Sequence, residues 1–143
     1  MGISFAFQTT CTLKNRTILK QWIKLVIENN NKKVGEIAYI FCSDEQLLKI
    51  NKEFLNHDYY TDIITFDYSE TDVVSGDMFI SIDRIKDNAK ILGVAYQEEL
   101  HRVIIHGILH LLGNKDKTET ESENMRKLED ECLSVLSTFI KEK

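Results

Sequence analysis

The chain has 143 residues, of which 43% are hydrophobic and 29% charged, and its formal net charge is −5. This composition is typical of an ordinary globular domain and excludes a disordered or collagen-like chain. No run of about 18 apolar residues is present, which excludes a membrane-spanning helix. We therefore expect residues 1–143 to form a single domain.

Three cysteines stand far apart, at positions 11, 42 and 132, without a CxxC pair. Such spacing is typical of buried thiols in a reducing compartment and argues against a disulfide framework. The start of the chain has no basic segment followed by an adequate apolar one, so it does not look like a signal peptide. These features predict a cytoplasmic protein.

Charge is distributed unevenly along the chain. Residues 1–34 contain six lysines and arginines and one glutamate, a net charge of +5, so the remaining residues carry −10. Arg16, Lys20 and Lys24 follow one another at four-residue spacing and form a basic ridge on one side of a predicted helix. The ridge is a candidate phosphate-binding face. An ordinary solvated helix face explains it equally well.

The first half of the chain predicts two strands and two helices. Residues 3–8 alternate apolar and polar side chains, and residues 15–29 place apolar side chains at helical spacing. Residues 36–42 are rich in Ile, Tyr and Phe and predict the second strand. Ser43 and Gln46 then have the spacing of a capping box, which opens a helix to about residue 54.

The second half predicts strands at 61–68 and 77–82 and helices at 83–93, 96–112 and 118–140. Because the polar turn between these two strands is too short for a crossover, they must pair antiparallel. The element order predicts an α+β domain, with a single mixed sheet of about four strands and helices packed against it. The helix at 96–112 has no charged residue from Val103 onward and is expected to be central and buried.

This expected central helix contains the chain's clearest functional motif. His106 and His110 stand four residues apart, so they lie on one face of a helix, close enough to bind one cation. Gly113 can end the helix, and Asp116 can then reach the side that the histidines face. Hydrogen-bonded core histidines are the alternative, but this combination favours a metal site. Three protein ligands with a fourth position open is the composition of a catalytic zinc site.

The HxxxHxxGxxD spacing also matches the skeleton of an extended metallopeptidase motif. Such a peptidase carries a glutamate directly after the first histidine as its general base. Here that position is Gly107, which has no side chain to accept a proton. Peptide hydrolysis by this mechanism is therefore excluded.

With glycine at this position, residues 106–113 (HGILHLLG) closely resemble the YbeY family, rRNA maturation factors with the motif HGxLHLxGxxH. Residues 61–66 (TDIITF) and the Gly-Asp pair at 76–77 are supporting matches. The resemblance implies that His106 and His110 are zinc ligands. Asp116 replaces the third histidine of the family motif, and aspartate is a competent zinc ligand.

The resemblance further implies a single-strand-specific endoribonuclease that binds one Zn²⁺ ion, or another divalent metal. It implies a role in 16S rRNA 3′ end processing and ribosome quality control, with ribosomal RNA and the ribosome or its small subunit as partners and without membrane or nucleotide cofactor. Tyr59 and Tyr60 are candidates for base stacking. Family members usually carry an arginine where this chain has Leu55, and Lys52 is a nearby cation.

The catalytic groups themselves are not identified by the sequence, which offers two weak candidates. His57, in a polar loop, is either a proton-transfer group or phosphate contact, or an ordinary surface histidine. Asp77, expected at the start of a strand, either orients a metal-bound histidine or closes a turn. His101 lies off the metal face and is expected to be structural.

Two other interpretations of the same ligand set stay open. Two histidines and a carboxylate also form the facial triad of non-haem Fe(II) oxygenases, although that triad usually sits on a β-barrel. Alternatively, the metal is structural, in a ribosome-associated RNA-binding factor that catalyses no reaction. A closed site of that kind needs a fourth protein ligand, for which Asp77 and His57 are distant candidates.

Overall fold

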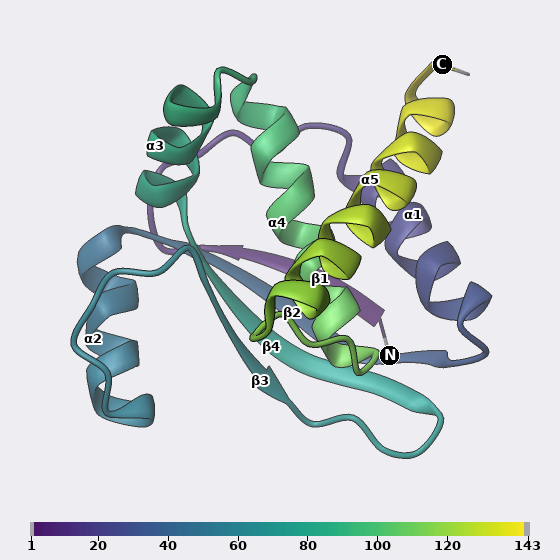
Figure 1. Ribbon diagram of the computed structural model, residues 1–143, viewed down its shortest axis with the longest axis horizontal. Coiled ribbons are helices and arrows are strands. Elements are labelled where there is room, and N and C mark those ends of the chain that lie inside the picture. Colours follow the sequence, from purple (N-terminus) through teal and green to yellow (C-terminus); the bar gives the residue numbers. More distant parts are fainter. Residues whose placement is uncertain (1, 142–143) are drawn as a thin grey trace.

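Four strands form one mixed sheet in this computed structural model, which describes residues 2–141, and five helices pack around it (Figure 1). The predicted α+β class is therefore confirmed. The strands are β1 (Gly2–Phe7), β2 (Lys33–Cys42), β3 (Ile63–Asp67) and β4 (Val73–Ser81). The helices are α1 (Arg16–Asn29), α2 (Asp44–Leu55), α3 (Ile82–Leu92), α4 (Tyr96–Leu111) and α5 (Glu119–Lys141).

The strands lie in the order β1-β2-β4-β3, so β1 and β3 are the two edges of the sheet. β1 pairs parallel with β2 and β2 pairs parallel with β4, each through a connection that contains a helix. β3 and β4 form the predicted antiparallel hairpin. Helices cover both faces: the core residues of α1, α4 and α5 pack on one face, and α2 packs with residues of β3 and β4 on the other.

Hydrogen bonds from two buried aromatic residues tie these layers together. The Tyr39 hydroxyl of β2 donates to the Ile104 carbonyl of α4 over 2.9 Å, and the Trp22 indole of α1 donates to the Cys132 carbonyl of α5 over 2.8 Å. Both rings are fully buried, so the bonds satisfy polar atoms that water does not reach. The first bond ties α4 to the sheet, and the second ties α1 to α5.

The predicted central helix is confirmed as α4, which is buried along most of its length. Gly107 packs directly against the sheet: a Cβ there would overlap the Met78 sulfur and lie 3.0 Å from Ile63 Cδ1. The end of the helix also lies close, since a Cβ on Gly76 of β4 would be 3.1 Å from Leu111. Small residues at these two positions let α4 lie directly on β3 and β4.

Two predicted boundaries were wrong. β4 begins at Val73, not at residue 77, because the segment through Gly76 pairs with both β2 and β3. Helix α3 begins at Ile82, and its N-cap is Ser81, whose hydroxyl accepts from the Arg84 amide over 3.2 Å; residue 83 already lies within the helix. Among the described residues, no helix has the length and apolarity needed to cross a membrane.

Candidate metal centre

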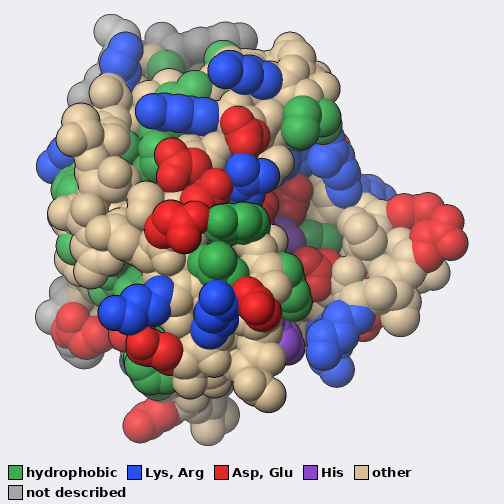
Figure 2. Space-filling model, turned by 90° about the vertical axis from the view of Figure 1, so that its left-hand side faces the viewer, with side chains coloured by type: hydrophobic (Ala, Val, Ile, Leu, Met, Phe, Trp, Pro, Cys, Tyr) green, Lys and Arg blue, Asp and Glu red, His purple; other side chains and the backbone are tan. Residues whose placement is uncertain are grey.

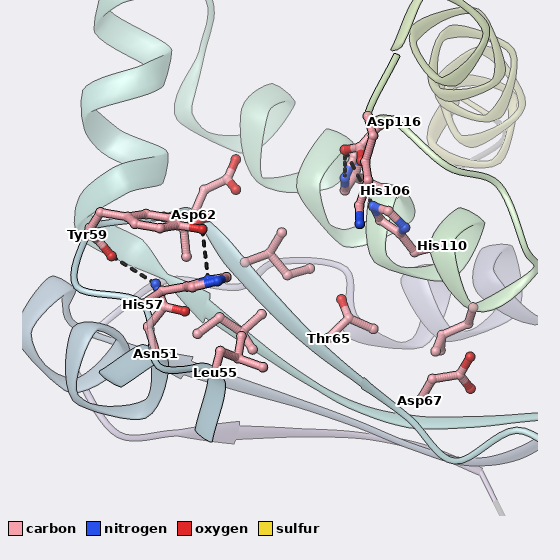
Figure 3. A pocket seen from close by; sticks show the side chains of 15 residues that line it. Asn51, Leu55, His57, Tyr59, Asp62, Thr65, Asp67, His106, His110 and Asp116 are labelled. Atoms are coloured by element: carbon pink, nitrogen blue, oxygen red, sulfur yellow. Dashed lines mark hydrogen bonds and ion pairs between the residues drawn. The ribbon is translucent and has the colours of Figure 1, made fainter. Parts of the chain in front are cut away.

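His106, His110 and Asp116 converge at the C-terminal end of α4 (Figure 3). One ligand atom from each side chain lies within 4.8 Å of the others. Asp116 Oδ2 lies 3.3 Å from His106 Nε2 and 3.4 Å from His110 Nε2. The structure thus brings together the three residues that the sequence motif singled out.

The chain returns to the histidines because the helix ends sharply after Leu111. Gly113 has φ +99°, a value that a residue with a side chain rarely adopts. Its amide donates to the His110 carbonyl over 2.9 Å, and the Asn114 amide donates to the Leu109 carbonyl over 3.0 Å. These bonds satisfy carbonyls at the helix end and reverse the chain direction. Asp116 therefore lies back over the helix terminus.

The geometry fits a small divalent cation. Two ligand atoms each about 2.0–2.1 Å from a tetrahedral zinc ion lie about 3.3 Å apart. The two histidine-to-aspartate distances, 3.3 and 3.4 Å, match that spacing. Imidazole nitrogen and carboxylate oxygen are both ordinary zinc ligands. The three residues present are therefore suited to hold zinc, with one side facing an open pocket.

Glu129 of α5 fixes the orientation of the His106 ring. Its Oε2 accepts a hydrogen bond from His106 Nδ1 over 2.7 Å, which places the ring proton on Nδ1 and leaves the Nε2 lone pair facing Asp116. Its Oε1 accepts from Arg102 over 2.9 Å, and Arg102 also donates to Asp130 over 2.7 Å. Glu129 is 6% exposed, so this is a buried carboxylate held by two partners.

The sequence did contain a signal for Glu129. On α5 it falls on the stripe that faces the core, four residues after buried Met125 and three before half-buried Cys132. A charged residue at such a position needs a polar partner. Its partner, however, becomes evident only once α4 and α5 are packed together.

The electrostatic environment favours a cation at this end of α4. Burial disfavours the charged form of His106, but the bond to Glu129 and the nearby carboxylates of Asp116 and Asp62 outweigh it and raise the pKa of the ring. Burial also raises the pKa of the Asp62 carboxyl. The carboxyl groups of Glu129, Asp116 and Asp62 thus surround the His106 ring, and their negative charge favours a cation at this end of α4.

An open pocket of about 580 Å³ extends from the metal centre along the edge strand β3 (Figure 3). In Figure 2 a hollow on this side of the molecule shows histidine side chains within it. Asp62, Thr65 and Asp67 line its sheet side, and Lys117 lies beside the metal ligands. The pocket is thus an open cleft with the candidate metal centre on one wall.

The far end of the pocket is formed by the loop that contains His57. The His57 and Tyr59 rings stack with centroids 5.1 Å apart, and the Tyr59 hydroxyl lies 2.9 Å from His57 Nδ1. Buried Asn51 anchors the loop, because its side chain donates to the Tyr59 carbonyl over 2.9 Å. Leu55, 41% exposed, also lines the pocket. His57 therefore lies in the same pocket as the metal centre, at the opposite end.

Asp77 is not brought to this site. Its neighbours Gly76 and Met78 face α4, so the Asp77 side chain points to the opposite face of the sheet, where it lies beside Tyr68. The prediction that Asp77 orients a metal-bound histidine is therefore wrong. The strand begins four residues earlier than expected, so Asp77 does not close the turn either.

Three other residues also lie outside the ligand group. His101 is buried, its ring 6.4 Å from Trp22, and burial lowers its pKa to about 4, as befits a structural residue. The Tyr60 hydroxyl donates to Glu45 over 2.6 Å, outside the pocket lining. Lys52 pairs with Asp58 at 3.3 Å and does not line the pocket.

The protein is thus of a class with a mixed sheet, a buried helix that ends in two histidines and a returning carboxylate, and a candidate metal site in an open cleft. The family model described as "Endoribonuclease YbeY" matches residues 5–137. The chain belongs to the YbeY family, which confirms the resemblance seen in its motif.

Curated relatives and a solved structure agree with this assignment. The chain is 54% identical to Endoribonuclease YbeY of Porphyromonas gingivalis, over 87% of this chain and 83% of that protein. It is 49% identical to Endoribonuclease YbeY of Flavobacterium johnsoniae, over 93% of this chain and 96% of that one. The solution structure of TM1509 from Thermotoga maritima has a TM-score of 0.65 and 25% identity, and the match covers 99% of this chain and 95% of that chain.

Proposed function

We propose that residues 1–143 act as one metal-dependent, single-strand-specific endoribonuclease domain. The observation that carries this proposal is the convergence of His106, His110 and Asp116 on the wall of an open cleft. The relatives named above are endoribonucleases, which supports RNA as the substrate. We further propose one Zn²⁺ ion as the metal and the cytoplasm as the place of action.

When bound, a divalent cation of this kind lowers the pKa of water or acts as a Lewis acid on a phosphoryl oxygen. The protein's part is to hold the ligands in place. Glu129 keeps the Nε2 lone pair of His106 directed into the site, and the Gly113 turn keeps Asp116 against both histidines. Two of the three candidate ligands, His106 and Asp116, are therefore held by groups outside the ligand set.

The other residues of the pocket supply contacts for a single strand. The Tyr59 and His57 rings offer an exposed aromatic surface on which a base can stack. If the Tyr59 hydroxyl donates to His57 Nδ1, His57 Nε2 carries the ring proton and can donate to a phosphate oxygen. Lys117 supplies a positive charge next to the metal ligands. The Asp62 carboxyl, whose pKa burial raises, also lines the cleft.

The outer edge of β3 adds backbone hydrogen-bond donors and acceptors to the cleft. Tyr68 and Asp62 bond to Ser75 and Ser81 of β4, so even-numbered residues of β3 face β4 with their amides and carbonyls. In an antiparallel pair the alternate residues then direct these groups away from the neighbour strand. The backbone amide and carbonyl of Thr65, a residue that lines the cleft, accordingly point to the outer edge of the sheet. Such an edge can bind an extended substrate.

The test compares one RNA sequence as a single strand and in a duplex, incubated with the wild-type protein and with His110→Ala. We expect cleavage of the single strand by the wild type and none by His110→Ala. Activity that requires Fe(II) and O₂ would instead indicate an oxygenase. A protein that binds RNA and metal stoichiometrically but never cleaves would indicate a structural metal.

We propose ribosomal RNA as the physiological substrate, at the 3′ end of 16S rRNA on the small subunit, in maturation and quality control. The family's endoribonuclease name and its motif support this proposal. The measurement is cleavage of a 3′-extended 16S precursor within isolated small subunits. Cleavage within the single-stranded extension is expected, and equal cleavage of unrelated single strands would refute this substrate choice.

A further inference from the structure

A second groove, of about 420 Å³, lies at the opposite edge of the sheet from the metal centre. It lies between α1 and the first residues of β1 and β2, and three lysines line it: Lys20, Lys24 and Lys33. We propose that this basic groove binds phosphates of the same RNA strand that the cleft cleaves, at a point several nucleotides away. The proposal rests on the endoribonuclease function proposed above.

The lysines of the basic groove are exposed and available. Within residues 2–141, no ion pair is recorded for Lys20, Lys24 or Lys33, whereas Lys32 lies 3.9 Å from Asp72. Among the described residues that line the groove, Glu28 is the one acidic side chain, so their net charge is positive. Three ammonium groups around one concave surface, none of them in an ion pair within residues 2–141, form a site for a polyanion.

The basic groove continues along the edge strand β1. Arg16 lies with its guanidinium 4.6 Å from the centre of the Phe7 ring, and the Lys20 amino group lies 5.7 Å from that of Phe5. Because α1 runs antiparallel to β1, successive cations of the helix stand beside successive side chains of the strand. These contacts hold the charges against the edge, and although Arg16 Nε donates to the Leu13 carbonyl over 3.3 Å, the Lys20 ammonium and the terminal guanidinium nitrogens of Arg16 can face phosphates.

The sheet register relates the basic groove to the metal cleft. One transverse row joins Ile3 of β1, Ile37 of β2, Gly76 of β4 and Asp67 of β3. Ile3 lines the basic groove and Asp67 lines the cleft. Three steps between strands, each about 4.8 Å, separate them by about 14 Å. The two sites therefore lie at the same level along the strands.

Both sites open on the face of the sheet that α1, α4 and α5 cover. Phe5, on the same side of β1 as Ile3, lies 5.6 Å from the Tyr39 ring, which is bonded to α4. On β3, Ile63 contacts α4 and Asp67 lies on the same side. A strand can therefore pass from one site to the other around the ends of the helices without crossing the sheet.

This spacing predicts a dependence on RNA length. A stacked strand advances about 3.4 Å per nucleotide, so at least about four nucleotides separate the two contacts. RNA is favoured over an acidic protein as occupant because the same polyanion must enter the cleft, and because the chain outside residues 1–34 carries −10 and repels RNA. The basic groove then supplies attraction that the rest of the surface lacks.

The experiment uses a triple variant, Lys20→Glu, Lys24→Glu and Lys33→Glu, and two RNAs of about 4 and about 20 nucleotides with 2′-O-methyl groups to prevent cleavage. The matched control changes three exposed lysines of α2 and α3 to glutamate: Lys49→Glu, Lys86→Glu and Lys90→Glu. For the long RNA we expect the groove variant to bind at least about tenfold more weakly. The slope of log affinity against log salt should also fall by about 2, since three phosphate contacts are lost.

The short RNA should bind the groove variant and the control variant alike. Equal binding of the long RNA by both variants, or an equal loss for both RNA lengths, would overturn the groove proposal. A variant with three glutamines, which removes charge without adding repulsion, should show a smaller loss of the same kind. A separate assay with cleavable RNA keeps the two proposals apart, because failure of the wild type to cut either RNA would count against the endoribonuclease function itself.

Discussion

Glu129 holds His106 by a 2.7 Å hydrogen bond between Oε2 and Nδ1, across 23 residues of sequence. The bond joins α4, the helix that contains both histidines, to the C-terminal helix α5. The same carboxylate accepts a hydrogen bond from Arg102. The position of α5 and the orientation of one candidate ligand are therefore linked. This relationship can be tested independently of catalysis.

Glu129→Ala should weaken zinc affinity about 10- to 100-fold, because the His106 ring loses its orienting partner. The metal-free variant should also lose about 3 kcal/mol of unfolding free energy, since Arg102 is left partly buried with a single partner. Zinc competition titration and urea unfolding measure the two effects. Asp130→Ala is the matched control: it removes the other Arg102 bond, does not touch His106, and should leave zinc affinity unchanged.

Gly107→Ala should destabilise the fold, although alanine in a helix interior is more favourable than glycine by up to about 1 kcal/mol. The new Cβ would overlap the buried Met78 sulfur, and overpacking of this kind costs about 1–3 kcal/mol. In the double variant with Met78→Ala the clash is absent. A double-mutant cycle by urea unfolding should therefore give a coupling of about 1 kcal/mol or more. Additive effects would show that α4 is not packed this tightly. The same contact leaves no room for a peptidase glutamate.

Asp116→Ala should lower metal affinity severely, because one of three ligands is lost, whereas Asp116→His should retain metal. The histidine variant replaces a charged ligand by a neutral one and raises the formal charge of the centre from +1 to +2. The stronger field should shift the acidic limb of the pH–rate profile to lower pH. Asp67→Ala, which lines the cleft outside the ligand group, should bind metal normally. Full metal content in Asp116→Ala would exclude this residue as a ligand.

His101 should make the fold acid-sensitive. Burial lowers its pKa to about 4, from 6.5 for an exposed histidine, so the unfolded chain binds the extra proton more readily than the folded protein. The contribution of His101 to the unfolding free energy is fully present above pH 6.5 and is lost as the pH falls toward 4. Between pH 7.5 and 4.5 the loss is about 2–3 kcal/mol. In His101→Leu this contribution should vanish, so urea unfolding at both pH values should give a smaller difference; an unchanged difference would refute the assignment.

The elements that local patterns specify were predicted well. α4 was expected at 96–112 and spans Tyr96–Leu111, because its apolar run and Gly113 are local signals. The Ser43 capping box is present, with the Gln46 amide donating to Ser43 over 3.2 Å. The grouping of the three candidate ligands was predictable for the same reason, since one helix and the turn after it contain them all.

What could not be predicted depends on how distant segments pack. Gly76 looked like the residue before a strand, yet it lies within β4 because this segment pairs with both β2 and β3. It is a glycine there because Leu111 and the Phe66 carbonyl approach too closely for a side chain. The face to which Asp77 points follows from that register, so its predicted role was wrong. Glu129 meets His106 only when α5 packs on α4, a long-range contact that no local spacing encodes.

The most direct test of the account is a titration of zinc into metal-free protein, with cleavage of a single-stranded RNA measured at every step. We predict no cleavage in the presence of chelator, and a rate that rises linearly and levels off at one equivalent of zinc. His110→Ala should bind no stoichiometric zinc and stay inactive, with a largely unchanged fold by circular dichroism. Undiminished cleavage by metal-free protein, or by metal-free His110→Ala, would contradict the central claim that His106, His110 and Asp116 form the catalytic metal site.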